Sequence, residues 1–552
     1  MIMLKSLKKM DFWKVVTLSV LVAYGFFFLF PIVKMMSQAI YTPERGFTLA
    51  NFEKFFSQPF YFTTILNSFK ISITVTLLTM VIGIPLAYFT SMYKIKGKKF
   101  LNIVIILCSM SAPFIGAYSW ILLLGRSGVI TKLVKSTLGF QIPDIYGFSG
   151  IVLVLTLQLF PLVYLYIQGA LRSVDNSLFE ASESMGIKGL QRFTKVVIPL
   201  IKPTIYASAL LVFMTSFADF GTPMLIGEGY RTFPRLIYDQ FISEVQTDAG
   251  FAAAISIIAI VVTTMVFLFQ RWLSNRNQFS MSALHSIEEK PMKKGMAFWV
   301  HLFIYGVVGI AYMPQLYVFY TSFLKTSGLI FVPGYSLNSY KEAFNRLGNS
   351  IQNTFIIPGV SLVIIVLMAI LIAYIAVRRR NTLSAAVDTI SMIPYIITGS
   401  VIGIALLSAF SARPFVLTGT FTIMVIALVI RRLPYTIRSS VAILSQISLS
   451  VEEAAISLGS SKSKTFFKIT VPMMSAGIIS GAILSWITMI TELSTAVILY
   501  SGKTQTLTVS IYTQVLRGNY GIAAALSTIL SVLTIASLLI FMKISKDGDV
   551  RL

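Results

Sequence analysis

The sequence predicts an all-α integral membrane protein, with 12 transmembrane helices arranged as two parallel six-helix halves. Three observations support this fold class. Only 12% of the 552 residues are charged and 56% are hydrophobic, whereas a soluble domain carries about 25% charged residues. Long apolar runs recur along the whole chain, and one short polar motif occurs twice, at the same place in each half.

The apolar runs have the length that a bilayer requires. A transmembrane helix needs about 20 mainly apolar residues. The predicted spans of the first half are 14–38, 64–92, 101–124, 148–171, 197–226 and 250–272. Those of the second half are 297–323, 351–377, 384–409, 414–437, 470–499 and 521–543.

One hydrophilic segment, 273–296, separates the two sets of spans. We interpret it as a cytoplasmic linker between a first half, residues 1–272, and a second half, residues 297–552. Because each half contains an even number of spans, the two halves enter the membrane in the same orientation.

Basic residues predict which side of the membrane each loop faces. The loop after the second span reads "YKIKGKK", and Arg378, Arg379 and Arg380 follow the eighth span. Short loops rich in Lys and Arg stay in the cytoplasm, so we expect both termini and the linker to be cytoplasmic. The net charge of +24 then reflects membrane orientation and does not indicate a nucleic-acid partner.

The two halves share residues at fixed offsets. Pro161 aligns with Pro434, and the register then holds without a gap as far as Pro199 and Pro472. Nearer the start of each half, Asn67 corresponds to Asn353, and Ala87-Tyr88 to Ala373-Tyr374. A duplication without functional meaning is one explanation. Matched polar residues in cytoplasmic loops, where lipid imposes no pattern, favour a functional one.

The repeated polar motif reads "EASESMGIKGL" (180–190) and "EAAISLGSSKS" (453–463). Each copy predicts a short helix that starts near its first Glu, since acidic residues suit a helix N-terminus. A glycine turn and a second short helix follow. We expect each copy to form a small, rigid knob on the cytoplasmic side.

This motif resembles the cytoplasmic signature of binding-protein-dependent ABC importer permeases: Glu-Ala-Ala, three residues, Gly, then a hydrophobic residue and Pro about a dozen residues on. The second copy matches at Glu453, Ala454, Ala455, Gly459 and Pro472. The first copy matches at Glu180, Ala181, Gly186 and Pro199, with Ser182 in place of the second Ala. The resemblance covers both halves and implies a fused permease with ABC type-1 cores at about 62–271 and 349–541.

The resemblance also implies the partners. The expected protein is the permease subunit of an ATP-driven importer in a bacterial inner membrane. Two copies of an ATPase subunit would receive the knobs, and an extracytoplasmic substrate-binding protein would deliver the cargo. The chain itself is not expected to be an enzyme or to hold a cofactor. ATP and Mg would bind the separate ATPase, since "SGKT" (501–504) lacks the first glycine of a phosphate-binding loop: Val497 stands there.

The residues predict no metal site, because one cysteine and two histidines are too few for one. Within the family, the segments 111–130 and 217–227 resemble fused permeases of the ferric iron type. Relatives that handle thiamine, 2-aminoethylphosphonate or polyamines remain alternatives for the cargo.

Two acidic residues, Asp219 and Glu492, lie at matched positions inside predicted spans. An acid inside the membrane is costly and is usually paired or lines a cavity. One hypothesis is that both line the translocation path and favour a cationic cargo. The alternative is that each acid is structural, hydrogen-bonded between helices or near the outer interface.

Two other classes of protein fit part of the sequence. A secondary active transporter can also consist of six plus six spans, but the loop "YKIKGKK" does not match the pattern of the largest such family. A membrane-embedded enzyme would need a clustered catalytic set, for which Asp219 and Glu492 are the one candidate pair.

Overall fold

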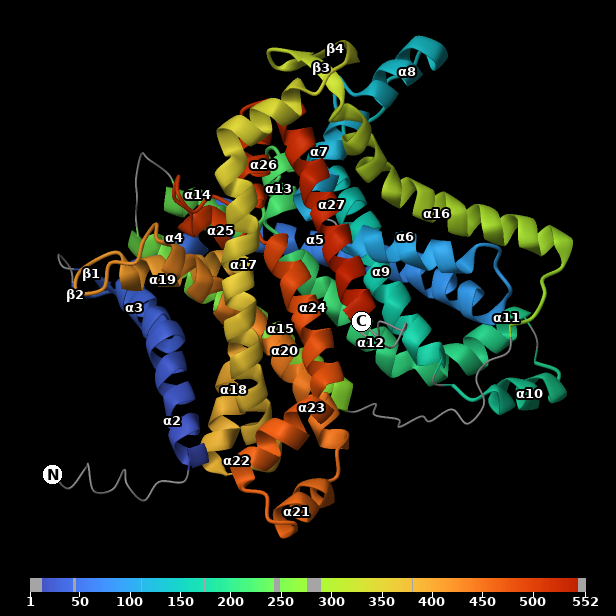
Figure 1. Ribbon diagram of the computed structural model, residues 1–552. Coiled ribbons are helices and arrows are strands. Elements are labelled where there is room, and N and C mark those ends of the chain that lie inside the picture. Colours follow the sequence, from blue (N-terminus) through green and yellow to red (C-terminus); the bar gives the residue numbers. More distant parts are fainter. Residues whose placement is uncertain are drawn as a thin grey trace.

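Helices make up most of the structure, a computed structural model shown in Figure 1. It describes residues 12–42, 46–110, 112–172, 174–187, 189–242, 249–275, 289–379 and 381–544. The greater part of the predicted linker lies outside these ranges. Two short antiparallel hairpins, β1–β2 and β3–β4, supply the strands of the described residues.

The first half begins with a helix that contains one π-helical turn and continues through the following elements. They are α2 (Phe12–Tyr24), η1 (Gly25–Leu29), α3 (Phe30–Ile40), β1 (Tyr41–Thr42), β2 (Gly46–Phe47), α4 (Ala50–Ser57), α5 (Pro59–Met92), α6 (Lys98–Met110), α7 (Pro113–Leu124), α8 (Val129–Leu138), α9 (Phe148–Arg172), α10 (Asn176–Ser184), α11 (Gly189–Arg192), η2 (Phe193–Val197), α12 (Ile198–Phe217), α13 (Gly221–Ile226), α14 (Phe233–Ile242) and α15 (Ala249–Asn275).

The second half repeats most of this order, but α20 follows α19 without a helix equivalent to α8. Its elements are α16 (Lys294–Thr321), β3 (Leu324–Ser327), β4 (Ile330–Tyr335), α17 (Asn338–Arg378), α18 (Thr382–Ile396), α19 (Gly399–Phe410), α20 (Phe421–Gln446), α21 (Leu449–Ser457), α22 (Lys462–Thr465), η3 (Phe466–Thr470), α23 (Val471–Met473), α24 (Ser475–Ile490), α25 (Ala496–Leu499), α26 (Leu507–Leu516) and α27 (Tyr520–Ile544).

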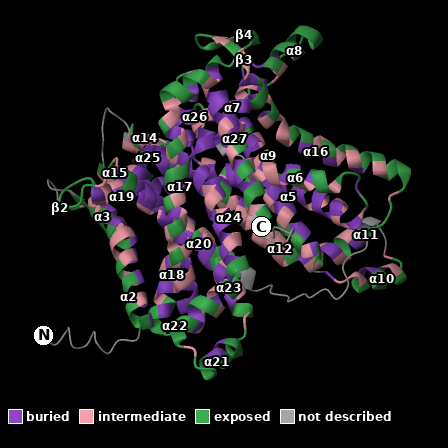
Figure 2. Cartoon of the chain, in the orientation of Figure 1, coloured by how far each residue is buried: buried purple, intermediate pink, exposed green. Residues whose placement is uncertain are grey.

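The helix packing confirms the predicted duplication. In the first half, α5 packs against α9, and α12 packs against both. In the second half, α17 packs against α20, and α24 packs against both. The large apolar cores lie around these helix sets, with buried residues concentrated where the helices meet (Figure 2).

The first helix of each half crosses to the other half. The α2–α3 helix packs against α17, α18 and α19, and α16 packs against α6 and α7 (Figure 1). Both also touch the last helix of their own half, since α3 contacts α15 and α16 contacts α27. The sequence gives no sign of this exchange, because hydropathy marks a span without marking its neighbours.

Each of the twelve predicted spans overlaps a helix of the structure. Among the described residues, nine helices are long and apolar enough to cross a membrane, and eleven if each sharply bent pair counts as one span. Helix α20, at the tenth predicted span, carries three arginines and begins at Phe421 rather than 414. Thr420 caps its first turn there, accepting a hydrogen bond from the N–H of Ile423.

Several predicted spans are broken, which is a correction to the expectation of continuous helices. Helices α18 and α19 meet at 111°. The segment from α22 to α23 meets α24 at 65°. The fifth and eleventh predicted spans also end early, at Phe217 and Ile490, and restart as the short helices α13 and α25.

Candidate functional site

The first polar motif folds into the short helix α10 and a tight turn. The carboxylate of Asp175 caps the helix by accepting a hydrogen bond from the N–H of Ser177 at 2.9 Å. The helix therefore starts at Asn176, and Glu180 lies in its middle, not in its first turn as the sequence predicts. Gly186 follows the helix with φ +77°, a left-handed conformation that glycine adopts at little cost.

The second motif has the same construction. Ser448 caps α21 through the N–H of Ser450, so Glu453 is also an internal helix residue. Gly459 follows the helix with φ +89°. In both copies the chain then continues through a four-residue helix and a π-helical turn toward Pro199 or Pro472, which lies near the start of the next helix. The structure thus contains the predicted helix and turn twice.

The two knobs differ at two buried positions, since Phe179 in the first corresponds to Glu452 in the second, and Ser182 corresponds to Ala455. Ser182 in the first knob and Ala455 in the second are both buried, whereas Glu180, Ala181, Glu453 and Ala454 are exposed. The Ser182 hydroxyl donates a hydrogen bond to the carbonyl of Phe179 at 2.8 Å. The helix itself therefore satisfies the extra polar atom, and the departure from the family signature does not change the exposed surface.

Each knob ends in a bare apolar side chain. Met185 is 77% exposed and Leu458 is 90% exposed, and the two residues occupy matched positions directly before the turn glycines. The sequence pattern contains this signal, a large apolar residue inside a polar motif, but the two residues are not among the predicted site residues. Exposed apolar tips of this kind are suited to contact with another protein surface.

An exposed ion pair holds the first knob. Glu183 of α10 contacts Lys290 at 2.5 Å and Arg192 at 3.7 Å. Lys290 belongs to the end of the linker, and its backbone pairs with the chain just after α5 through the carbonyl of Met92 and the N–H of Lys94. The linker therefore joins the first knob to the end of α5.

A buried ion pair holds the second knob. The Glu452 carboxylate is 5% exposed and accepts hydrogen bonds from Arg378 Nε at 2.8 Å and from the Tyr374 hydroxyl at 3.1 Å. Arg378 also donates to the carbonyl of Ile447 at 2.7 Å. Both knobs therefore lie at the end of the long helix, α5 or α17, where the basic loops lie; we call this end the basic side.

Matched aromatic pairs support the knobs from behind. Tyr88 of α5 packs against Phe193 with ring centroids 4.8 Å apart, and Tyr374 packs against Phe466 at the same distance. In the second half, Trp13 of α2 stacks on Tyr374 at 4.3 Å. The Ala-Tyr and Phe positions that the repeat matches in sequence are therefore in direct contact in both halves.

The opposite ends of α5 and α17 are fixed by a second matched pair. The Asn67 side chain donates to the carbonyl of Arg231 at 3.0 Å, and Asn353 donates to the carbonyl of Lys503 at 2.9 Å. These contacts position the loops before α14 and α26 on the side of the molecule away from the knobs.

An exposed ion cluster lies on that same outer side. Arg126, after α7, contacts Asp144 at 2.8 Å and Glu228 at 2.9 Å. Hydrogen bonds to Glu228 and then to Asp144 raise the pKa of Arg126 above its usual value. The cluster joins the loops that follow α7 and α13.

The two intramembrane acids cap matched helices. Asp219 accepts the N–H of Thr222 at 3.0 Å, and Glu492 accepts the N–H of Thr495 at 3.0 Å. Each acid thus lies at the break in its span and caps the short helix that follows. Hydrogen bonds of this kind fit the structural hypothesis for the two acids, and the hypothesis that they line the translocation path stays a prediction.

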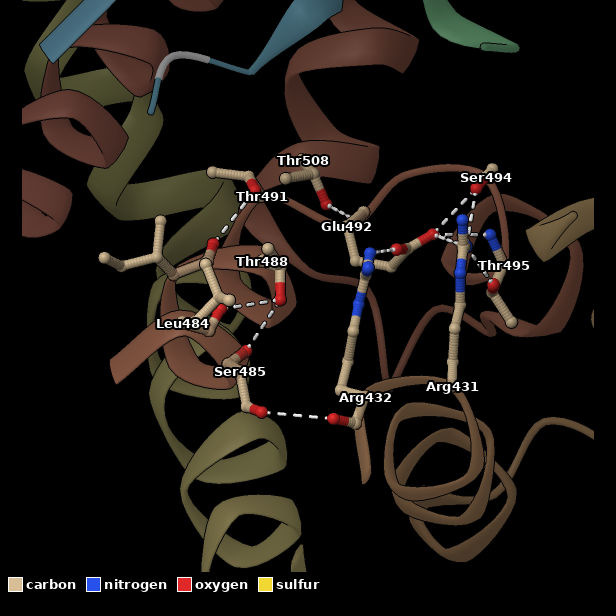
Figure 3. Close-up of polar contacts among 11 residues, drawn as sticks. Arg431, Arg432, Leu484, Ser485, Thr488, Thr491, Glu492, Ser494, Thr495 and Thr508 are labelled. Atoms are coloured by element: carbon tan, nitrogen blue, oxygen red, sulfur yellow. Dashed lines mark hydrogen bonds and ion pairs between the residues drawn. The ribbon is translucent and has the colours of Figure 1, made fainter. Parts of the chain in front are cut away.

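Glu492 has further partners that give it a different environment (Figure 3). Arg431 and Arg432 extend from α20, and both form ion pairs with its carboxylate. Ser494 also donates to it, at 2.8 Å. The matched positions in the first half are Gln158 and Leu159, so no arginine pair stands at the corresponding place near Asp219.

The two acid-bearing loops meet where the halves touch. A Cβ atom added to Gly221, two residues after Asp219, would lie 3.5 Å from Leu493 Cδ2, next to Glu492. The same atom would lie 3.2 Å from Cβ of Phe114, at the start of α7. The acids therefore lie at equivalent positions beside the contact between the halves, as expected from the repeat.

A cavity of about 310 Å³ opens nearby, between α7, α16 and α27. Its lining is mostly apolar, and its hydroxyl groups, such as those of Thr491 and Thr528, are bonded to carbonyls of their own helices. Among the described residues, no group of three or more His, Cys, Asp or Glu side chains could hold a metal ion.

The arginine pair is absent from the residues that the sequence predicts for the site. A signal was present, because two adjacent arginines inside a predicted span are rare and need a partner. Glu492 could have been recognised as that partner only from the packing of α20 against the eleventh span.

A duplicated bundle of membrane-spanning helices, with a matched knob on the basic side of each half and charged groups where spans break, defines a membrane permease made of two fused halves. Sequence comparison identifies which permeases these are. The chain belongs to the family described as "Binding-protein-dependent transport system inner membrane component", whose model matches residues 80–278 and again 345–546. It is therefore an ABC importer permease.

Several curated relatives share much of the sequence. The chain is 29% identical, over 97% of its length and 78% of the relative, to the ferric transport system permease protein FbpB of Actinobacillus pleuropneumoniae. It is 24% identical, over 83% of its length and 85% of the relative, to the Fe(3+)-transport system permease protein FbpB 2 of Haemophilus influenzae. The spermidine/putrescine transport system permease protein PotB of the latter species is 25% identical and matches 45% of this chain with 88% of its own length.

Proposed function

We propose that the chain is the permease subunit of an ATP-driven importer of ferric iron. The cargo assignment rests on the two relatives named for ferric transport, which match most of this chain. Polyamine transport is the main alternative because of the half-length relative PotB. Thiamine and 2-aminoethylphosphonate are further alternatives.

The basic side is the cytoplasmic side in this proposal. Lys94, Lys96, Lys98 and Lys99 surround the end of α5, and Arg378 and Arg379 end α17. Loops of this composition stay inside the cell. Helix α2 begins on the same side, since Trp13 stacks on Tyr374, which supports a cytoplasmic N-terminus. Twelve spans, the number that the sequence predicts, would bring the C-terminus back to the same side.

The observation that carries the proposal is the pair of exposed tips, Met185 and Leu458. An exposed apolar side chain on each knob is unfavourable in water and becomes favourable when a partner buries it. Two equivalent tips fit two equivalent apolar pockets on a partner, which we call sockets. We therefore infer two copies of an ATPase subunit, each with one socket. ATP and Mg bind those subunits, and closure of the ATPase pair moves both knobs.

The knobs can transmit that movement because each is fixed to a long helix. Glu183 and Glu452 connect them to the ends of α5 and α17, and the matched aromatic pairs support them from behind. Displacement of a knob therefore displaces a whole half. The halves then alternate between two arrangements as rigid bodies around the central contact.

The outer side offers a surface for the binding protein that would deliver the cargo. Helix α8 and the hairpin β3–β4 project from this side in Figure 1. Both carry exposed apolar side chains, among them Leu133 on α8 and Ile330 and Tyr335 on the hairpin.

The test replaces both tips by acid. The M185E/L458E variant and its ATPase are co-expressed and purified from membranes, and binding-protein-stimulated ATP hydrolysis is measured in liposomes. We expect at least about a tenfold loss of co-purified ATPase, because each socket would have to bury a charge. The matched control is L49E, the same change at an exposed apolar residue between β2 and α4, outside both proposed docking surfaces.

Full co-purification and stimulation with both tips replaced would contradict the docking role. Cargo uptake by the permease alone, driven by an ion gradient without any ATPase, would instead favour the alternative of a 6+6 secondary active transporter.

A further inference from the structure

The Glu492 carboxylate is surrounded by hydrogen-bond donors of its own protein. It accepts hydrogen bonds from Arg431, Arg432 and Ser494 and from the backbone N–H of Thr495. A carboxylate offers about four acceptor sites. Three of these donors bind Oε1, and Arg432 binds Oε2 (Figure 3). The two guanidinium groups beside the carboxylate therefore oppose the approach of a cationic cargo.

The cluster carries positive charge in excess. Two guanidinium groups face one carboxylate, which leaves one positive charge uncompensated within the cluster. The Nε atom of Arg432 is buried and has no hydrogen-bond partner. A buried donor without an acceptor is costly, and a guanidinium has five N–H donors, of which this cluster uses only a part.

The break between α18 and α19 adds to the positive character of this place. Helix α19 begins at Gly399, and its N-cap residue, Thr398, makes no side-chain capping bond. Gly399 lies directly against Arg431: a Cβ there would fall 1.7 Å from Nη1. The glycine therefore makes room for the guanidinium at the positive end of a helix that starts inside a broken span.

We propose that Arg431, Arg432 and the N-terminus of α19 form an oxyanion site that receives an anionic group of the cargo. Planar guanidinium groups match the geometry of carboxylates and phosphates. Helix N-termini at breaks in transmembrane helices are suited to anionic parts of transported molecules. The inference rests on the proposed transport function and narrows its substrate class to species that expose a carboxylate or phosphate oxygen.

The site occurs once, in the second half. In the first half Gln158 and Leu159 replace the arginines, and Phe114 packs where α7 approaches Gly221. A metal cation passing this site would meet repulsion unless anionic ligands masked its charge. A ferric iron cargo would therefore pass this site as a complex with an anionic ligand and not as the bare ion.

Binding of inorganic phosphate to the purified chain in nanodiscs, measured by calorimetry, tests this site without any ATPase. The triple variant R431Q/R432Q/E492Q removes all three charges together and leaves no buried ion unpaired. We expect it to weaken phosphate binding by about tenfold or more, since each charge-assisted hydrogen bond is substantial. The E492Q variant keeps both arginines, frees their donors and should tighten binding several-fold.

The matched control is R438Q, on the same helix, where the arginine is half-exposed and pairs with Asp388 at 3.6 Å. It should bind phosphate like the unaltered chain. Equal affinity in all four proteins, or weaker binding by E492Q, would overturn the proposal. If the triple variant fails to fold, the direction of the E492Q effect still decides the question. Binding-protein-stimulated ATP hydrolysis by the unaltered chain reports separately on the proposed transport function.

Discussion

The two halves share one architecture but place different chemistry at the same point. In the first half, Asp219 caps a short helix beside an apolar contact made by Phe114 and Gly221. In the second half, Glu492 caps the equivalent helix but is enclosed by two arginines. The knobs show the same contrast: an exposed ion pair holds the first knob, and a buried ion pair holds the second. The two halves therefore keep equivalent backbone positions, while at these positions the buried ion pairs of the described residues lie in the second half.

The largest expected effect on stability comes from removing both arginine partners of Glu492. R431L/R432L leaves a buried carboxylate without a counter-ion, which should cost about 3–5 kcal/mol of unfolding free energy. The comparison is D219A in the first half, which removes only a helix cap and should cost about 1 kcal/mol. Thermal unfolding in detergent measures both. If adding E492L to the double variant restores stability, the unpaired charge of Glu492 is the cause of the loss. Equal losses of unfolding free energy in R431L/R432L and D219A would contradict the proposed difference between the halves.

A smaller difference should separate the two knob anchors. R378A leaves Glu452 buried and unpaired and should cost about 3 kcal/mol. K290A removes an exposed partner of Glu183 and should cost at most about 1 kcal/mol. Unfolding at low and high salt distinguishes them, because screening weakens only the exposed pair. A K290A loss as large as that of R378A, or one insensitive to salt, would show that the linker holds the first knob more tightly than its exposure suggests.

The smallest effect is expected at the position where Ser182 of the first knob corresponds to Ala455 of the second. S182A removes a hydroxyl that bonds only to its own helix, and A455S adds one at the matched buried position. Each change should alter stability by no more than about 0.5 kcal/mol and leave binding-protein-stimulated ATP hydrolysis unchanged. A marked change in hydrolysis from S182A alone would mean that the sockets distinguish the two knobs through this residue.

Much of this fold could be predicted from sequence because its strongest signals are local. Span lengths depend on hydropathy over about 20 residues, and the knobs depend on a glycine and a helix within one short motif. The repeat also predicts that a contact in one half recurs in the other, as the contact of Tyr88 with Phe193 does in Tyr374 and Phe466.

The remaining features depend on packing between distant segments. Hydropathy does not encode direction, so the 111° bend between α18 and α19 leaves no mark on the pattern. The start of α10 at Asn176 depends on the cap supplied by Asp175, which lies outside the repeated motif. The enclosure of Glu492 by Arg431 and Arg432 joins residues about 60 positions apart, and only the folded structure brings them together.

The crossed first helices have a consequence for how the chain is made. A ribosome delivers α2 and α3 long before α17, α18 and α19, against which they pack. The first half in turn lacks its neighbour α16 until the linker has been synthesised. Neither half can complete its packing while it alone is in the membrane, although domains commonly fold in order of synthesis. The apolar faces of α2 and α3 must therefore remain in lipid, or under the protection of the insertion machinery, until most of the second half has been inserted.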